Sequence, residues 1–237
     1  MRIMCVGDSM TIGSAGDYTW RYRLWEHLRA RGTVPVRFVG PREALYEGSH
    51  AYGDPAFPRH ARRHLAGWGE GWLHHAPRIA EAVRVHRPGT LLVSLGLIDL
   101  GFYTDARQTA SNVRRFVAGA RSADPAVRAV LLPVIPNIRA ATDPPFAAEC
   151  ARFNALLADA VAELTTPASP LVLADPPADW DPVRDTYDGT HPAAPGEHRL
   201  AAAFADALHA AWSLAAPYPL PEAAPAEAVL PEAAPVA

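Results

Sequence analysis

Short apolar runs alternate with longer helical patterns along most of this chain, and this alternation constrains the fold more than any other feature. Five runs of β-forming residues are expected to be strands, namely 3–6, 36–39, 90–95, 129–134 and 171–173. Five longer segments carry helical patterns, namely 20–30, 72–86, 106–123, 146–164 and 195–211. Each of these helices is long enough to cross over a sheet, so the pattern predicts parallel βαβ units. We expect a three-layer α/β/α sandwich around a mainly parallel five-stranded sheet.

A flavodoxin-like sheet of this kind gathers the carboxyl ends of its strands at one edge, where open α/β sheets bind their ligands. The first expected strand runs directly into the turn Gly7-Asp8-Ser9, which places Ser9 at this edge. Near the other end of the chain, the loop Asp188-Gly-Thr-His191 sets an aspartate three residues before a histidine. A serine hydroxyl becomes nucleophilic when a base takes its proton, and a carboxylate can hold that base in the right tautomer.

Each of these two segments alone is also a common turn or helix cap. Their order and flanking residues together resemble the GDSL/SGNH serine hydrolase superfamily, whose first block carries the nucleophile and whose last block reads Asp-x-x-His. The segment 20–25 (Trp-Arg-Tyr-Arg-Leu-Trp) is similar to the first helix of actinobacterial-type members, and the resemblance covers about residues 1–212. It implies Ser9 as nucleophile, His191 as base and Asp188 as the partner that orients His191.

The second block of the superfamily contributes a glycine amide to the oxyanion hole. The segment 65–69 (Leu-Ala-Gly-Trp-Gly) resembles its small-Gly-Trp form. The resemblance implies that the amides of Ser9 and Gly67 bind the oxyanion, with Gly69 as the alternative to Gly67. A simple glycine-rich turn is the competing interpretation of this segment.

The third block normally reads Gly-x-Asn-Asp after a buried strand, but here the sequence is Gly96-Leu97-Ile98-Asp99. A side-chain amide aimed at a developing oxyanion contributes a few kcal/mol, roughly, to transition-state stabilisation, and isoleucine offers no donor. Slower chemistry or a changed reaction would follow. Asn137 is a candidate replacement because it follows another apolar run, although a turn asparagine after proline is the more ordinary interpretation.

Further candidates for the wall of the substrate pocket are Asp8, Trp68, Asp99 and Phe102, with Asp99 ordering its own loop rather than acting in catalysis. The irregular segment 46–63 is long enough to be a lid or a binding wall, in which Tyr52 and Phe57 would help to shape the pocket. Ordinary surface packing is an equal alternative for that segment.

Histidines occur four residues apart at His60 and His64 and side by side at His74 and His75, but no metal-binding motif accompanies them. We therefore expect solvated histidines on helix faces and no metal site. No phosphate-binding or dinucleotide-binding glycine motif follows a strand, and a covalent acyl-enzyme needs no cofactor, so none is predicted.

Composition fits one globular domain, since the chain has 237 residues, of which 49% are hydrophobic and 20% are charged. A net charge of -3 argues against a nucleic-acid partner. The two cysteines predict no disulfide framework, and neither a leader nor a membrane-length apolar run is present, so a cytoplasmic location is expected. We expect a catalytic domain over 1–214 and a flexible tail rich in Pro, Ala and Glu over 215–237, in which residues 220–225 are repeated as 230–235. The oligomeric state is left open.

The leading hypothesis is an esterase that hydrolyses a small-molecule acyl ester through an acyl-enzyme on Ser9. An acyltransferase that passes the same acyl group to a sugar or a specialised metabolite is the first alternative. A binding protein that has lost oxyanion competence, as Ile98 suggests, is the second.

Overall fold

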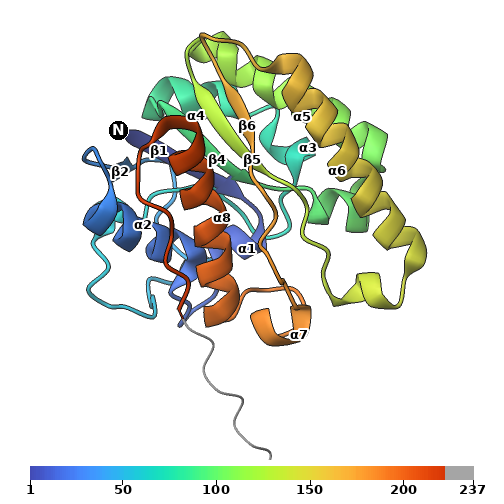
Figure 1. Ribbon diagram of the computed structural model, residues 1–237, viewed down its shortest axis with the longest axis horizontal. Helices are drawn as coiled ribbons and strands as arrows, with labels where there is room; N and C mark the ends of the chain where they lie inside the picture. The colour runs from blue at the N-terminus through green and yellow to red at the C-terminus, as the bar shows by residue number, and fades with distance from the viewer. Residues whose placement is uncertain (222–237) are drawn as a thin grey trace, which may run out of the picture.

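The computed structural model describes residues 1–221, and a six-stranded sheet forms its centre (Figure 1). The strands are β1 (Arg2–Gly7), β2 (Arg37–Phe38), β3 (Leu65–Ala66), β4 (Thr90–Ser94), β5 (Arg128–Leu132) and β6 (Leu171–Leu173). Their order is β2-β1-β4-β5-β6, β3 pairs with β1, and every pairing is parallel. Without β3 this is the flavodoxin-like order, so the predicted fold class is confirmed.

The central strands are apolar over their whole length because helices cover both faces of the sheet. All residues of β4 are buried, and the side chains from Ile3 to Val6 in β1 are fully inaccessible. Continuous apolar runs of this kind are typical of parallel strands, whereas one-sided sheets show alternation. The five predicted strands are present, and none of their ends shifts by more than two residues.

The sixth strand, β3, was not predicted because two residues are too few to carry a pattern. It shares one edge of β1 with β2. Arg2 and Ile3 pair with β2, whereas Val6 and Gly7 pair with β3. This arrangement brings the segment after Ala66 to the carboxyl end of β1, directly beside Ser9.

The helices are α1 (Ser9–Ile12), α2 (Thr19–Arg31), α3 (Trp72–His75), α4 (Ile79–His86), α5 (Ala106–Ala123), α6 (Pro144–Leu164), α7 (Pro182–Asp185) and α8 (Ala194–Trp212). The predicted helix 72–86 is split into α3 and α4, because Pro77 lacks the N–H that would continue the first of them. The single-turn helices α1 and α7 were not predicted. Short 3₁₀ turns lie at Tyr46–Gly48, Arg59–Ala61 and Ile138–Ala141, and one π-helical turn lies at Asp99–Tyr103.

Two helical layers enclose the sheet. Helices α2 and α8 pack together on one face, and the series α4, α5 and α6 covers the other (Figure 1). Trp20 of α2 stacks on Phe204 of α8 with ring centroids 4.6 Å apart. On the opposite face, Trp72 meets Phe116 edge to face at 5.1 Å.

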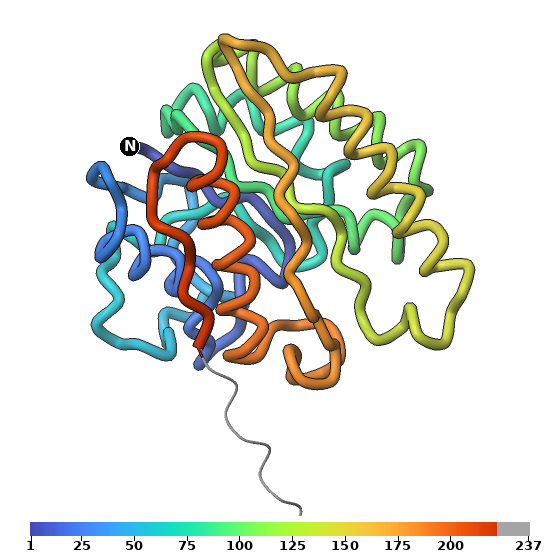
Figure 2. Tube along the Cα trace, in the orientation of Figure 1, coloured from blue at the N-terminus to red at the C-terminus, as the bar shows by residue number. Residues whose placement is uncertain are grey.

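The folded domain extends beyond the predicted boundary at residue 214. Figure 2 shows the chain after α8 turning back along that helix. Ala215 pairs with Gly32, and the Tyr218 amide donates to Asp206 at 2.8 Å. The boundary therefore lies too early, because these residues add contacts that hold α2 and α8. Residues 222–237, with the second copy of the tail repeat, lie outside the described part. No helix within residues 1–221 combines the length and apolar character needed to cross a membrane.

Candidate active site

Ser9 is the first residue of α1 and directly follows the turn at the end of β1, at the carboxyl edge of the sheet. The Asp8 side chain caps α1 by accepting the Met10 amide hydrogen at 3.0 Å. Gly7 packs so tightly that a Cβ there would lie 2.0 Å from the Thr11 hydroxyl oxygen. A larger residue at position 7 would therefore displace α1, and with it Ser9.

Two aspartates expected in the substrate pocket serve as buried helix caps instead. Asp8 is only 2% exposed, and Asp99 is completely buried. Asp99 accepts the amide hydrogens of Trp72 at 2.8 Å and Leu73 at 3.1 Å, at the start of α3. Burial raises the pKa of Asp8 to about 7; the Met10 amide opposes this shift and the charge of Asp99 adds to it. The sequence-based prediction for these two residues is corrected, because backbone N–H groups occupy carboxylate oxygens that a substrate would need.

Asp188 and His191 form a hydrogen-bonded pair within one short loop. His191 Nδ1 lies 2.6 Å from Asp188 Oδ2. The other carboxylate oxygen, Oδ1, accepts the backbone amides of Thr190 at 2.9 Å and His191 at 2.7 Å. Burial alone would raise the pKa of Asp188, but its hydrogen bonds to His191 and Thr190 outweigh burial and lower that pKa. The carboxylate is therefore ionised and positioned to orient the imidazole.

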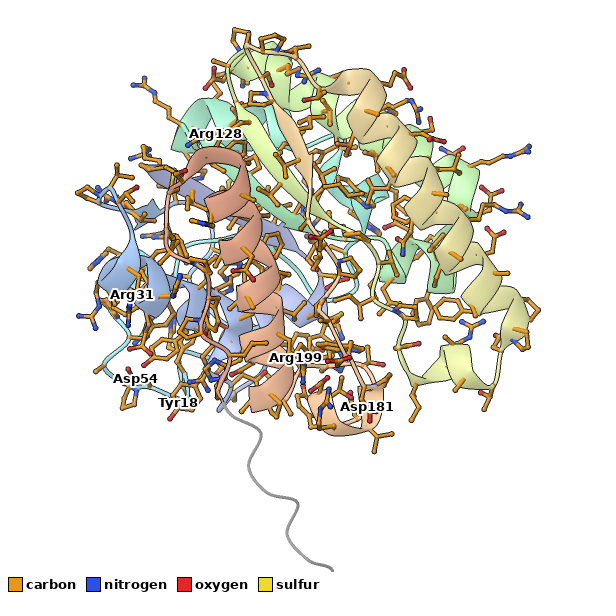
Figure 3. The ribbon with its side chains drawn as sticks, in the orientation of Figure 1. Tyr18, Arg31, Asp54, Arg128, Asp181 and Arg199 are labelled. Carbon is orange, nitrogen blue, oxygen red and sulfur yellow. The ribbon has the colours of Figure 1, made fainter. Side chains whose placement is uncertain are left out.

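The base of this loop is fastened to α7 and α8. The Ala193 amide donates to the Asp185 carbonyl oxygen at 2.9 Å, and Arg199 Nε of α8 donates to the buried Asp185 carboxylate at 3.2 Å. Figure 3 labels Arg199 on α8 and Asp181 beside α7. The Asp181 amide donates to the same Asp185 carboxylate at 2.9 Å. This anchoring fixes where His191 lies relative to the sheet edge.

A cavity of about 360 Å³ is lined by both Ser9 and His191, although these residues lie far apart in the sequence. Trp68, Phe102, Ile98 and Asn137 line the same cavity. Three larger hollows, of about 640, 580 and 450 Å³, contain neither Ser9 nor His191. Within residues 1–221 no hydrogen bond joins the Ser9 hydroxyl to His191, and such bonds often tighten only in the substrate complex.

Aromatic rings stack with the imidazole of His191. Trp68 stacks on it with centroids 4.5 Å apart, and Tyr187 does so at 5.8 Å. Tyr46 in turn lies 4.2 Å from Trp68 between ring centroids. Tyr187 and Tyr46 were not singled out from the sequence. Adjacency to the Asp-x-x-His segment could have pointed to Tyr187, whereas no pattern marks Tyr46.

The glycine loop after β3 departs from the prediction at Gly67. The Gly67 amide donates to the Gly7 carbonyl oxygen at 3.1 Å, so it extends the sheet and is not available to an oxyanion. A Cβ at Gly67 would lie 2.3 Å from the Glu70 carboxyl carbon, and this close packing explains the glycine. Gly69, the alternative, lines the cavity in a left-handed conformation with φ of 70°. Across the described residues neither the Gly69 amide nor the Ser9 amide donates to a protein group.

The segment 46–63 is mostly packed surface rather than a pocket wall. Tyr52 is 5% exposed and Phe57 is 1% exposed, and both belong to a small apolar cluster with Tyr22 and Leu45. The rings of Tyr52 and Phe57 meet edge to face with centroids 5.2 Å apart. Of the segment's aromatic residues, only Tyr46 reaches the ring stack at the cavity, through Trp68. The expectation that Tyr52 and Phe57 shape the pocket is therefore wrong.

Two of the four singled-out histidines are buried, contrary to the expectation of solvated side chains. His64 Nε2 lies 3.0 Å from the Ala44 carbonyl oxygen, and His75 Nε2 lies 3.1 Å from that of Gly7. Burial lowers the pKa of His75 to about 4, so this ring is neutral. In the described part of the chain, no group of three or more His, Cys, Asp or Glu side chains is placed to hold a metal ion.

The sequence also matches a known protein family. A profile of the GDSL-like lipase/acylhydrolase family matches residues 5–199, and the chain belongs to that family of ester hydrolases. No protein of curated function matches the sequence.

Several solved structures share the fold. An acetyl esterase variant crystallised with an acetate ion is 24% identical, with a TM-score of 0.70 over 85% of this chain and 92% of that one. A carbohydrate esterase of family 3 from Talaromyces cellulolyticus is 24% identical, with a TM-score of 0.71 over 86% and 94%. An acetylxylan esterase from Geobacillus stearothermophilus is 15% identical, with a TM-score of 0.64 over 87% and 93%.

Proposed function

We propose that this protein is a serine esterase that cleaves a carboxylic ester through an acyl-enzyme intermediate. The observation that carries the proposal is the 2.6 Å contact between His191 Nδ1 and Asp188 Oδ2, together with the cavity that His191 lines with Ser9. A base oriented in this way can activate a serine hydroxyl. The three residues follow the order and spacing of the family's first and last blocks.

In the first half of the reaction, Ser9 Oγ attacks the ester carbonyl carbon while His191 Nε2 takes the hydroxyl proton. The carbonyl π electrons move to oxygen, and Asp188 stabilises the imidazolium that forms. The tetrahedral intermediate then releases the alcohol, which receives the proton from His191. In the second half, water attacks the acyl-serine with His191 again as base, and the acid leaves as Ser9 regains its proton.

The negative oxygen of each tetrahedral intermediate needs hydrogen-bond donors already in place. We assign this role to the backbone amides of Ser9 and Gly69. Both residues line the cavity, and both amides are uncommitted within residues 1–221. We assign Gly69 rather than Gly67 because the Gly67 N–H donates a hydrogen bond within the sheet.

The substrate we propose is a short acyl group carried on a small molecule such as a sugar. The cavity volume of about 360 Å³ suits a short acyl chain, and apolar Leu97 and Phe146 are part of its wall. Phe102 is 77% exposed and Trp68 is 38% exposed, so both rings offer an accessible apolar surface to the alcohol part. The names of the similar structures, which include acetyl and carbohydrate esterases, support the same choice.

Hydrolysis is favoured over acyl transfer by the openness of the site. Transfer to a sugar or metabolite hydroxyl requires that water be kept from the acyl-enzyme. The Asp188 side chain is 44% exposed, and Phe102 at the cavity is even more accessible. Water therefore reaches the catalytic loop, which favours hydrolysis.

Labelling by a fluorophosphonate, followed by intact-mass measurement, tests the proposal directly. The native chain should gain one adduct and hydrolyse p-nitrophenyl acetate, whereas Ser9→Ala should do neither. Ser14→Ala is a matched control at a nearby serine that does not line the cavity, and it should label like the native chain. A folded native protein that neither labels nor turns over would contradict the esterase and favour a binding protein.

A further inference from the structure

Ile98 and Asn137 follow neighbouring strands and line the same cavity. Ile98 lies after β4 and Asn137 after β5, and these strands pair up to Ser94 and Leu132 at their carboxyl ends. Strand β1, which leads to Ser9, pairs with β4 on its other edge. The family carries its asparagine at the position of Ile98. The topology thus places Asn137 near the same reaction centre as Ile98.

The carboxamide of Asn137 has an uncommitted donor. Its Nδ2 carries two hydrogens and donates one to the Thr190 hydroxyl oxygen at 3.0 Å. In the described part of the chain the second hydrogen has no partner, and the buried Oδ1 has none either. Buried polar atoms are usually paired, and exceptions concentrate at functional sites. The single hydrogen bond to Thr190 therefore does not account for the position of the Asn137 carboxamide.

Anchoring of the catalytic loop does not explain the residue either. The Ile138 amide donates to the Gly189 carbonyl oxygen at 2.8 Å, which already ties the segment after β5 to the loop. The Tyr187 amide donates to the His191 carbonyl oxygen at 3.0 Å and closes the loop on itself. The loop is thus held by its backbone, and the Asn137 side chain is available for another task.

We propose that Asn137 Nδ2 is a third oxyanion donor. From the segment after β5 it supplies the side-chain amide that the family carries after the strand equivalent to β4, where this chain has Ile98. The inference rests on the proposed serine esterase function. As Ser9 Oγ adds to the acyl carbonyl, the oxygen that gains charge accepts the free Nδ2–H of Asn137, and no further bond forms or breaks. The Thr190 contact keeps the amide beside His191 in both halves of the reaction.

Kinetics of p-nitrophenyl acetate hydrolysis by Asn137→Ala and Asn137→Asp test this role. A donor that acts only in the transition state should lower kcat by about 10²- to 10³-fold while KM changes little. Asn137→Asp preserves the size of the side chain, removes both donors and adds a negative charge that opposes the oxyanion. Matching thermal unfolding of the native chain and Asn137→Asp confirms that the loss is chemical.

A rescue experiment separates a donor from a merely structural residue. Ile98→Asn places a side-chain amide in the segment after β4, and in the Asn137→Ala background it should recover kcat by about tenfold or more, in line with the contribution of one such donor. Thr190→Val removes the contact with Asn137 but leaves the N–H groups of Asn137 in place. The kcat of Thr190→Val should therefore fall much less than that of Asn137→Ala.

Three results would overturn the inference. The first is an Asn137→Ala enzyme whose kcat stays close to the native value. The second is a loss that Ile98→Asn fails to rescue and Thr190→Val reproduces, which would make Asn137 a positioning residue of the loop. Both leave the esterase itself intact. A native chain without labelling or turnover would instead overturn the esterase, and this inference with it.

Discussion

The indole of Trp68 stacks on the imidazole of His191, with ring centroids 4.5 Å apart and planes inclined by 24°. The two residues lie far apart in the sequence. Asp188 holds the edge of the imidazole through Nδ1, and Trp68 covers a face of the ring. The orientation of the proposed base therefore depends on the segment that follows β3 as well as on its own loop.

Trp68→Ala should lower kcat/KM for p-nitrophenyl acetate by about 2- to 10-fold, because an aromatic stack contributes roughly 0.5–1.5 kcal/mol beyond its buried area. Trp68→Phe keeps a flat ring and should retain most of the activity. Tyr103→Ala removes another aromatic side chain of the cavity that does not stack on His191, and it is the matched control. Equal losses in the Trp68→Ala and Tyr103→Ala variants would contradict a specific role for the stack.

Asp188→Asn should lower kcat by about 10³- to 10⁴-fold with little change in KM, because an amide in place of the carboxylate favours the wrong imidazole tautomer and cannot stabilise the imidazolium. Steady-state kinetics and the rate of fluorophosphonate labelling should fall together. Asp175→Asn, at an acidic residue that does not line the catalytic cavity, is the control. A loss smaller than tenfold in Asp188→Asn would show that His191 does not depend on this carboxylate.

Asp99→Ala should destabilise the fold by about 1–3 kcal/mol, because a buried and a partly buried amide at the start of α3 lose their acceptor. Urea unfolding measures the effect. Asp105 caps α5 at an exposed position through the Gln108 amide, so Asp105→Ala should cost less, typically ~1 kcal/mol. An unchanged midpoint in Asp99→Ala, with a raised KM, would restore the earlier expectation that Asp99 binds substrate.

Stability should fall as the pH rises from about 4 to 7, because burial raises the pKa of Asp8 to about 7, from an ordinary value of 3.8. Between these values the folded state keeps a proton that the unfolded state has lost, so the folded state is favoured at the acidic end of the range. The contribution is on the order of 2–4 kcal/mol. Asp8→Asn should flatten the dependence, which urea unfolding at pH 5 and pH 8 measures. If the dependence of stability on pH persists in Asp8→Asn, other groups are responsible for that dependence.

Long, strongly patterned elements could be predicted from the sequence, and short ones could not. Helix α5 has the predicted bounds, and each of the five predicted strands is present. The single-turn helices and β3 have too few residues for a repeating pattern, so only their neighbours in space stabilise them. For the same reason the sequence could not distinguish the roles of Gly67 and Gly69. The pairing of β3 with β1 decides that the Gly67 amide is hydrogen-bonded in the sheet.

By itself the sequence determined the fold class, the family, and the three residues Ser9, Asp188 and His191 as the candidates for catalysis. These follow from local properties, namely hydrophobic periodicity and motifs whose members lie within a few residues of each other. Tertiary structure alone decided that Asp8 and Asp99 are buried caps, that Trp68 covers His191, and that Asn137 shares a cavity with Ile98. Burial, stacking and hydrogen bonding depend on partners far away in the chain, and only the packed sheet and helices bring those partners together.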